Sequence, residues 1–389
     1  MSATFVKAER LQKLPPYLFA EIDRKKKAAI AAGRDVINLG VGDPDKATPS
    51  AIIKSLQSSV EVGSYHQYAL DQGAPELRQS IAKFMKHRYG VDLDPATEIL
   101  PTIGSKEAIA HFPLAVLNPG DVSLVPDPCY PVYRSSTTFA GGEVYTMPLE
   151  PKNGFKPDLD AIPEEIWKRA RILFLNYPNN PTGATADLPF FERVVELAKK
   201  HNVVVAQDAA YNEMYFETPP PSILQVPGAR DLAVEFHSLS KTFNMTGWRV
   251  GFAVGSAPIV AALGQIKANT DSGIFTAIQM AAKTALDEYD TLTPPIRALY
   301  KDRRDAFVGG LRKLGWDVPL QGATFYVWIP CPAGISSMDL CARLLEEVNI
   351  VTTPGVGFGP AAEGFIRVSL TVDTPRLLEA VDRISTLKL

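Results

Sequence analysis

The chain has 389 residues, 46% of them hydrophobic and 21% charged, which is the composition of an ordinary globular protein of about two domains. Its 40 basic and 43 acidic residues give a net charge of −3, so we expect neither nucleic acid nor a membrane as a partner. The charged N-terminus lacks the apolar core of a signal peptide, and no apolar run reaches the roughly 20 residues of a membrane span. Three scattered cysteines without a CxxC pair favour a reducing compartment over a disulfide framework or a zinc site. We therefore predict a cytoplasmic protein without a metal.

The first strongly patterned element is a helix between residues 74 and 90. Leu77, Ile81, Phe84 and Met85 recur there at helical spacing, and Gly90 follows as a stop signal. The preceding segment, residues 1–48, is expected to pack against the C-terminal part of the chain.

The middle of the chain alternates short apolar runs with amphipathic stretches such as residues 188–201. The runs that we predict as buried strands are residues 122–126, 171–175, 203–207, 233–237 and 250–254. This alternation predicts an α/β fold around a largely parallel or mixed sheet. In such sheets ligands bind at the carboxyl ends of the strands.

From about Pro294 the pattern changes. A long charged helix over residues 298–314 precedes two apolar runs, residues 324–330 and 365–370. We interpret this part as a second, smaller α+β domain. The predicted division is residues 1–48 for an N-terminal arm and part of the small domain, 49–290 for a large domain, and 291–389 for the small C-terminal domain.

Polar residues follow three of the predicted strands where each strand ends. Asp208 follows residues 203–207, "NYPNNPTG" (176–183) follows residues 171–175, and Ser238, Ser240 and Lys241 follow residues 233–237. A single aspartate in such a place is more often a helix N-cap than a catalyst. Polar residues at the ends of three strands that meet at one edge of a sheet favour a functional site there.

An anion site is also indicated. The helix that opens at Gly104 and Ser105 offers free backbone N–H groups, and Ser238, Ser240 and Arg249 could bind the same anion. A lysine beside a phosphate cradle, a carboxylate for a pyridine nitrogen and tyrosines near the ring are the chemical set of a pyridoxal phosphate enzyme. Asp208, Tyr211 and Tyr130 can fill the roles beside Lys241, which must lose its proton to attack.

The segment "SLSKTFNMTGWRVG" (238–251) resembles the lysine signature of the class I/II aminotransferases. The resemblance extends over nearly the whole chain, with landmarks in family order: "INLGVGDPD", "YALDQGAPELR", "GSKEA", "PDPCYPVY", "NYPNNPTG", "DAAY" and, after the lysine signature, "FIRVSL". It implies the fold-type I architecture, a large domain with a mostly parallel seven-stranded sheet and a smaller α+β domain. It also implies pyridoxal 5'-phosphate as cofactor and a homodimer with shared active sites, acting on amino acids and 2-oxo acids.

Carried over by position, the resemblance assigns Lys241 as the Schiff-base lysine and proton shuttle. It pairs Asp208 with the pyridine nitrogen, places Tyr211 and Asn180 at the ring oxygen, and stacks Tyr130 on the ring. The residues implied for the phosphate are Ser105, Lys106, Ser238, Ser240 and Arg249, with Tyr68 reaching it in the partner's site. Arg367 is implied as the clamp for the substrate α-carboxylate; a surface position on an edge strand is the alternative.

Two features resemble LL-diaminopimelate aminotransferases in particular. In "PPYLF" Tyr17 would contact substrate, or would pack the arm, and Gly42 would border the substrate carboxylate. Asp71, three residues after Tyr68, could bind a distal ammonium, or could cap a helix. We therefore predict transfer from LL-diaminopimelate to 2-oxoglutarate. The chain departs from that group in "SLSKTF" and "DSGIFTAIQ", so a broad-specificity alanine/aspartate aminotransferase stays open, as does a C–S lyase on the same scaffold.

Overall fold

The computed structural model describes residues 5–14, 18–69 and 72–388. Two of the predicted substrate residues, Tyr17 and Asp71, lie outside these ranges. None of the helices in the described ranges combines the length and apolar character that crossing a membrane requires.

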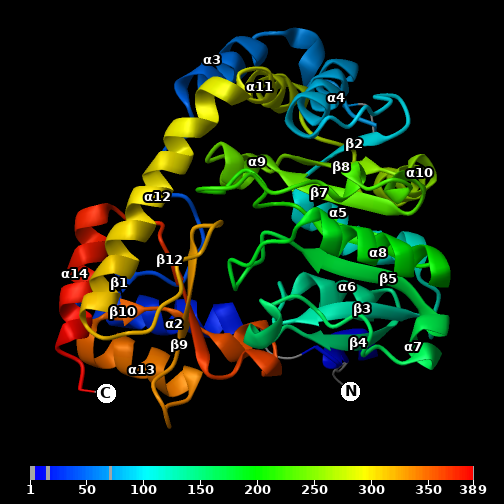
Figure 1. Cartoon of the computed structure of the whole chain (residues 1–389). Helices are drawn as coiled ribbons and strands as arrows, with labels where there is room; N and C mark the ends of the chain where they lie inside the picture. The colour runs from blue at the N-terminus through cyan, green and yellow to red at the C-terminus, as the bar shows by residue number, and fades with distance from the viewer. Residues whose placement is uncertain (1–4, 15–17, 70–71, 389) are drawn as a thin grey trace.

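A seven-stranded sheet forms the centre of the larger part of the molecule (Figure 1). Its strands are β2 (Ile99–Thr102), β3 (Val122–Asp127), β4 (Glu143–Pro148), β5 (Ala170–Asn176), β6 (Val204–Asp208), β7 (Ala233–Ser238) and β8 (Gly251–Gly255). They lie in the order β2-β8-β7-β6-β5-β3-β4, and only β8 runs antiparallel to its neighbours. The predicted α/β class and the five predicted strands are confirmed; β2 and β4 are additional.

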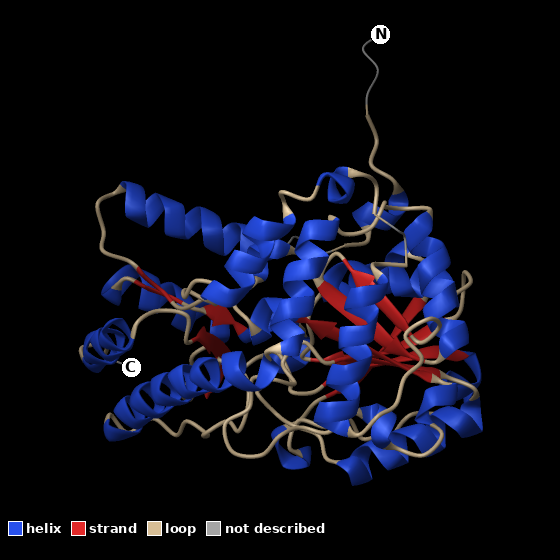
Figure 2. Cartoon of the chain, turned by 90° about the horizontal axis from the view of Figure 1, so that it is seen from above, coloured by secondary structure: helices blue, strands red, loops and turns tan. Residues whose placement is uncertain are grey.

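Helices cover both faces of this sheet (Figure 2). One face packs against α4 (Pro75–Tyr89), α8 (Leu188–His201) and α11 (Thr276–Asp287), and the other against α5 (Ser105–Val116), α6 (Val132–Phe139) and α10 (Ala257–Ala268). The helices α3 (Ser50–Ser59) and α7 (Glu164–Arg169) complete this part. Helix α4 ends as predicted at Gly90, which has the left-handed φ of 69° that glycine adopts without strain.

The smaller part contains a three-stranded antiparallel sheet of β11 (Thr353–Pro354), β12 (Phe365–Ser369) and β9 (Tyr326–Pro330). Helices α13 (Ser337–Val348) and α14 (Thr374–Ser385) pack on it. Strand β1 (Ile37–Asn38) pairs in parallel with β10 (Ile350–Val351), so the chain before the large sheet does lie against the C-terminal part. The short helix α1 (Glu9–Gln12) and the longer helix α2 (Leu18–Ala31) precede β1.

Helix α12 (Tyr289–Lys313) begins nine residues before the predicted start at residue 298 and includes Pro294 and Pro295. The sequence places a change of pattern at about Pro294, whereas the helix runs through this residue. Both prolines lie beyond the first turn, so each removes a backbone donor from the interior of the helix. The Thr293 hydroxyl donates to the Tyr289 carbonyl in the turn before them (2.9 Å). Tyr289 belongs to the core of the large sheet, whereas Tyr300 belongs to the core of the smaller part. The boundary between residues 290 and 291 stays a prediction.

Candidate active site

A cavity of about 360 Å³ opens between the carboxyl ends of β5, β6 and β7 and the smaller sheet. Twelve of the residues predicted from sequence line it: Gly42, Ser105, Lys106, Tyr130, Asn180, Asp208, Tyr211, Ser238, Ser240, Lys241, Arg249 and Arg367. The fold therefore brings together residues that are more than 300 positions apart in the chain. The lining also includes residues that sequence reasoning missed, namely Val41, Asn176, Ala210, Thr246 and Tyr326.

Lys241 lies on the short helix α9 (Leu239–Thr242), which follows β7 directly. Its Nζ donates a hydrogen bond to the carbonyl oxygen of Gly42 (2.7 Å). Burial lowers the pKa of the Lys241 ammonium to about 8, and the nearby cations Arg367 and Arg249 act in the same direction, whereas Asp43 opposes them. A lysine with this pKa is partly neutral near physiological pH, which is the state that can act as a nucleophile or accept a proton.

Asp208 ends β6, one strand away from Lys241. Its Oδ2 accepts a hydrogen bond from the hydroxyl of Tyr133 (2.7 Å), and its Oδ1 accepts one from the backbone N–H of Ala210 (3.2 Å). Burial raises the pKa of the Asp208 carboxyl to about 6, although both hydrogen bonds favour the charged form. Sequence reasoning missed Tyr133; its place three residues after Tyr130 in "PDPCYPVY" was the available signal.

The turn before α5, residues 103–106, is the predicted anion site, and we call it the anion turn. Gly104 has a φ of 77°, and a Cβ there would lie 2.4 Å from Nη2 of Arg249. Only glycine permits this approach of a guanidinium to the start of a helix. The free N–H groups of α5 and the Arg249 fork are donors suited to a phosphate. Ser238 and Ser240 line the same cavity, with the Ser240 N–H bonded to the Ser238 hydroxyl (3.3 Å).

Arg367 lies on β12, opposite the large sheet, and is buried. Its guanidinium stacks between the rings of Tyr326 (4.1 Å) and Phe358 (4.8 Å). Nη1 donates to Asn180 Oδ1 and Nη2 to the Gly40 carbonyl, both at 2.8 Å. These contacts fix the plane of the guanidinium, so Arg367 is a buried cation at the cavity wall and not a surface residue.

Tyr326 explains why residue 42 is a glycine. A Cβ on Gly42 would lie 1.9 Å from the Tyr326 hydroxyl oxygen, which no side chain can tolerate. The same hydroxyl lies 3.0 Å from that of Tyr211. Gly42, predicted to border the substrate, thus lets the backbone pass close to Tyr326 and present its carbonyl to Lys241.

Two predicted cofactor residues differ from the rest in exposure. Tyr68 is 93% exposed and does not line the cavity of its own chain. Lys106 is exposed, but its ammonium lies 5.9 Å from the centre of the Tyr130 ring. The exposure of Tyr68 is compatible with its predicted position in a partner's site.

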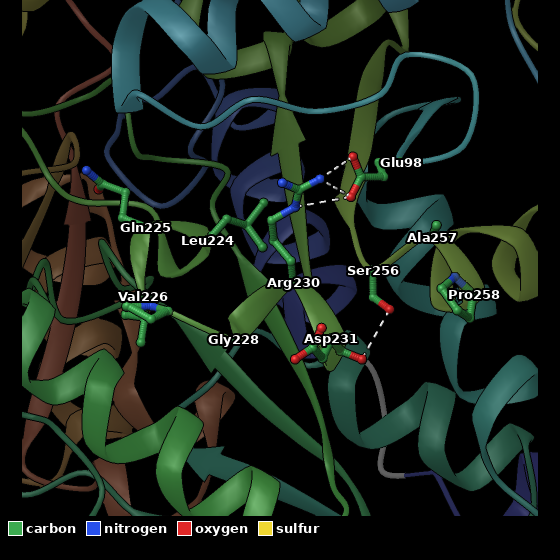
Figure 3. A pocket seen from close by; sticks show the side chains of 11 residues that line it. Glu98, Leu224, Gln225, Val226, Gly228, Arg230, Asp231, Ser256, Ala257 and Pro258 are labelled. Carbon is green, nitrogen blue, oxygen red and sulfur yellow. Dashed lines mark hydrogen bonds and ion pairs between the residues drawn. The ribbon is translucent and has the colours of Figure 1, made fainter.

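A second hollow lies at the opposite, amino-terminal ends of the central strands (Figure 3). Its single guanidinium, on Arg230, is already paired with both carboxylate oxygens of Glu98. This hollow has no lysine, tyrosine or buried unpaired acid among its lining residues. The candidate active site is therefore the cavity around Lys241.

A sequence model described as aminotransferase class I and II matches residues 34–384. The chain belongs to this family. It is a transaminase, whose substrates are amino acids and 2-oxo acids, as predicted from the sequence.

Relatives of this aminotransferase match it from end to end. The LL-diaminopimelate aminotransferase of Syntrophobacter fumaroxidans is 55% identical over 384 residues, which cover 98% of this chain and 99% of the relative. The LL-diaminopimelate aminotransferase of Aquifex aeolicus is 52% identical, with 98% and 99% covered. Among solved structures, substrate-bound BacF from Bacillus subtilis superposes with a TM-score of 0.96 at 38% identity, covering 99% of both chains. The fold class predicted from the sequence is thereby confirmed.

Proposed function

We propose that this aminotransferase transfers the amino group of LL-diaminopimelate to 2-oxoglutarate, giving tetrahydrodipicolinate and glutamate in lysine biosynthesis. The observation that carries the proposal is the buried Lys241 with its lowered pKa, set between Asp208 and Arg367 in one cavity. More than half of all positions are identical to LL-diaminopimelate aminotransferases along the full chain, which supports the choice of amino donor.

We propose pyridoxal 5'-phosphate as the cofactor, because the donor set of the cavity fits its three polar ends. The anion turn and Arg249 match a phosphate, Asp208 matches a protonated pyridine nitrogen, and Lys241 matches an aldehyde. Asn180 and the hydroxyl of Tyr211 remain as partners for the ring oxygen. When bound, this cofactor supplies the aldehyde that takes up amino groups and the ring that accepts the electron pair released at the substrate α-carbon.

The residues of the chain perform the remaining tasks. Asp208, fixed by Tyr133, keeps a negative charge where the ring nitrogen would lie. Arg367 binds the substrate α-carboxylate through its planar fork and so orients the α-hydrogen. Lys241, neutral above its pKa of about 8, accepts that proton and returns it at the neighbouring carbon. The same residues serve both half-reactions, as a ping-pong mechanism requires.

A homodimer with shared active sites is part of the proposal. Tyr68 and Phe275 are large side chains that are 93% and 38% exposed. Tyr68 lies between α3 and α4, and Phe275 directly precedes α11, which packs against α3 (Figure 1). Light scattering during size exclusion should give twice the mass of the 42.4 kDa chain. A monomeric mass together with full activity would contradict the shared site.

A substrate panel tests the proposed reaction. Glutamate formation from 2-oxoglutarate is measured with LL-diaminopimelate, aspartate or alanine as the donor, and we expect kcat/KM to be highest with LL-diaminopimelate. Comparable values for aspartate or alanine would instead support a broad-specificity enzyme. Pyruvate and ammonia released from a thioether amino acid without any 2-oxo acid would support the C–S lyase.

Asp71→Asn is expected to raise KM for LL-diaminopimelate by about tenfold or more, since it removes one charge-assisted hydrogen bond to the distal ammonium. KM for glutamate, which has no distal ammonium, should change little. Asp92→Asn, which removes an exposed carboxylate paired with Lys86, is the matched control. An equal rise in KM for LL-diaminopimelate and for glutamate would contradict the role of Asp71.

Tyr133→Phe is expected to weaken pyridoxal phosphate binding at mildly acidic pH. The Tyr133 hydroxyl opposes the rise that burial imposes on the pKa of Asp208, so its loss should raise that pKa further above about 6. The dissociation constant measured against pH should therefore begin to rise at a higher pH than in the wild type. Tyr177→Phe, which removes a buried hydroxyl bonded to the Phe155 carbonyl, should leave this profile unchanged.

A further inference from the structure

Four side chains gather behind the anion turn, outside the cavity. Glu107 and His111 lie on α5, while Lys267 and Asp271 lie at the end of α10 and just after it. The ligand atoms of Glu107, His111 and Asp271 lie within 4.8 Å of one another, a spacing that would suit a metal ion. A side-chain cation is already there: Nζ of Lys267 lies 2.6 Å from Asp271 Oδ1 and 3.8 Å from Glu107 Oε2.

Lys267 is 1% exposed, although lysine is among the residues least often buried. A buried ammonium is costly unless carboxylates offset the loss of its hydration, and Asp271 and Glu107 do so from two different segments. Asp271 Oδ1 also accepts the N–H of Gly273 (2.8 Å). Lys267 thus ties the loop after α10 to the first turn of α5.

Glu107 connects this ion cluster to the anion turn. Its Oε2 accepts the backbone N–H of Ile103 (3.0 Å), and its Oε1 is hydrogen-bonded to Nδ1 of His111 (2.8 Å). Ile103 is followed by Gly104, whose left-handed φ of 77° turns the chain into α5 under Arg249. The position of the Glu107 carboxylate therefore determines the path of the backbone that presents the first N–H groups of α5.

We propose that Lys267 and Glu107 are positioning residues for the phosphate of the cofactor. Lys267 holds the Glu107 carboxylate, and Glu107 holds the anion turn in the conformation that receives the phosphate. Neither side chain lines the cavity, so both act through the backbone of residues 103–105. The proposal rests on pyridoxal phosphate being the cofactor.

The test compares the binding of pyridoxal phosphate and of pyridoxal, which lacks the phosphate, to cofactor-depleted enzyme by equilibrium dialysis. Lys267→Met should weaken pyridoxal phosphate binding by about tenfold, the lower end of the effect known for residues that orient the ligands of a metal ion. Pyridoxal binding should stay within twofold of the wild type. The matched control is Lys301→Met, because Lys301 pairs with Asp305 at the same i,i+4 spacing but at an exposed position. This variant should change the binding of neither pyridoxal phosphate nor pyridoxal.

Glu107→Ala separates positioning from a simple charge effect. Removing a negative charge near an anion site strengthens anion binding by Coulomb's law, whereas removing the acceptor of the Ile103 N–H should weaken it. We expect weaker pyridoxal phosphate binding and unchanged pyridoxal binding. Since Glu107 is only half-buried, this variant also provides the answer if Lys267→Met fails to fold.

The possible outcomes are distinct. Equal losses for pyridoxal phosphate and pyridoxal, or a gain in Glu107→Ala, would overturn the positioning role while leaving the proposed function intact. A wild-type protein that binds no pyridoxal phosphate would overturn the proposed function itself, and this inference with it.

Discussion

Replacing Lys241 by alanine is expected to lower the rate of transamination by about 10⁴-fold, because the variant loses the group that both attaches the cofactor and moves the proton. Borohydride reduction of the wild-type protein with pyridoxal phosphate should label the peptide that contains Lys241. The variant should show no label and no visible absorbance band from lysine-bound cofactor. Since the pKa of Lys241 is about 8, the amount of pyridoxal phosphate that borohydride attaches to cofactor-depleted wild type should increase as the pH rises through 8. The pKa of an ordinary lysine lies well above this value.

Lys283→Ala is the control for this experiment, since Lys283 is a partly exposed lysine on α11 that pairs with the nearby Asp287. It should retain activity and the label at Lys241. A label on any other lysine of the wild type, or full activity of Lys241→Ala, would contradict the assignment of the reactive amine.

Replacing Arg367 should give the second large effect. Arg367→Lys keeps the positive charge but loses the planar fork, and we expect kcat/KM to fall by about 10²–10³-fold, the cost of breaking a buried, hydrogen-bonded charge pair. The loss should appear as a higher KM for both the amino acid and the 2-oxo acid, because each carries the same α-carboxylate. Steady-state kinetics in both directions measures it.

The affinity for pyridoxal phosphate distinguishes a role of Arg367 in binding the substrate carboxylate from a general structural role. Arg367→Lys should bind the cofactor within about twofold of the wild type, since the hydrogen bonds from Arg367 to Asn180 and to the Gly40 carbonyl lie outside the anion turn. Arg343→Lys, which changes a partly exposed arginine on α13 that pairs with Glu347, should leave both KM values unchanged. A lower kcat at unchanged KM would contradict a role in carboxylate binding.

The residues that sequence reasoning found are those whose position follows from local order. Asp208 is the last residue of β6 and Lys241 lies in the short helix that follows β7, and the carboxyl ends of parallel strands meet at one edge of the sheet. Arg249 is close in sequence to Lys241, and Arg367 is contained in a short motif that resembles the family. These assignments needed no knowledge of how the smaller part packs.

The residues that it missed depend on tertiary contact. Tyr326 follows Asp208 by more than a hundred positions, and nothing in "TFYVWIP" shows that its hydroxyl meets Gly42 and Tyr211. The donation from Tyr133 to Asp208 likewise depends on how α6 packs on the sheet. Lys267 resembles any lysine near a helix end, and only its burial between two carboxylates distinguishes it.

The two missed strands and the start of α12, which lies earlier than predicted, have a different cause. Strand β2 has four residues including Pro101, and β4 is a half-exposed edge strand, so neither forms the continuous apolar run by which the other strands were predicted. In α12 the packing of Tyr289 and Leu292 against the large core outweighs the cost of two adjacent prolines.

The path of α12 has a mechanical consequence for the cavity. This single helix joins the core beneath Lys241 to the core beneath Arg367, and Figure 1 shows it running along one side of the molecule from α11 to α14. Bending is easiest at Pro294 and Pro295, where backbone donors are missing. A tilt of about 5° there displaces the far end, some 18 residues away, by roughly 2 Å at 1.5 Å of rise per residue. A bend at these prolines would therefore change the separation of Lys241 and Arg367, although neither residue lies on α12.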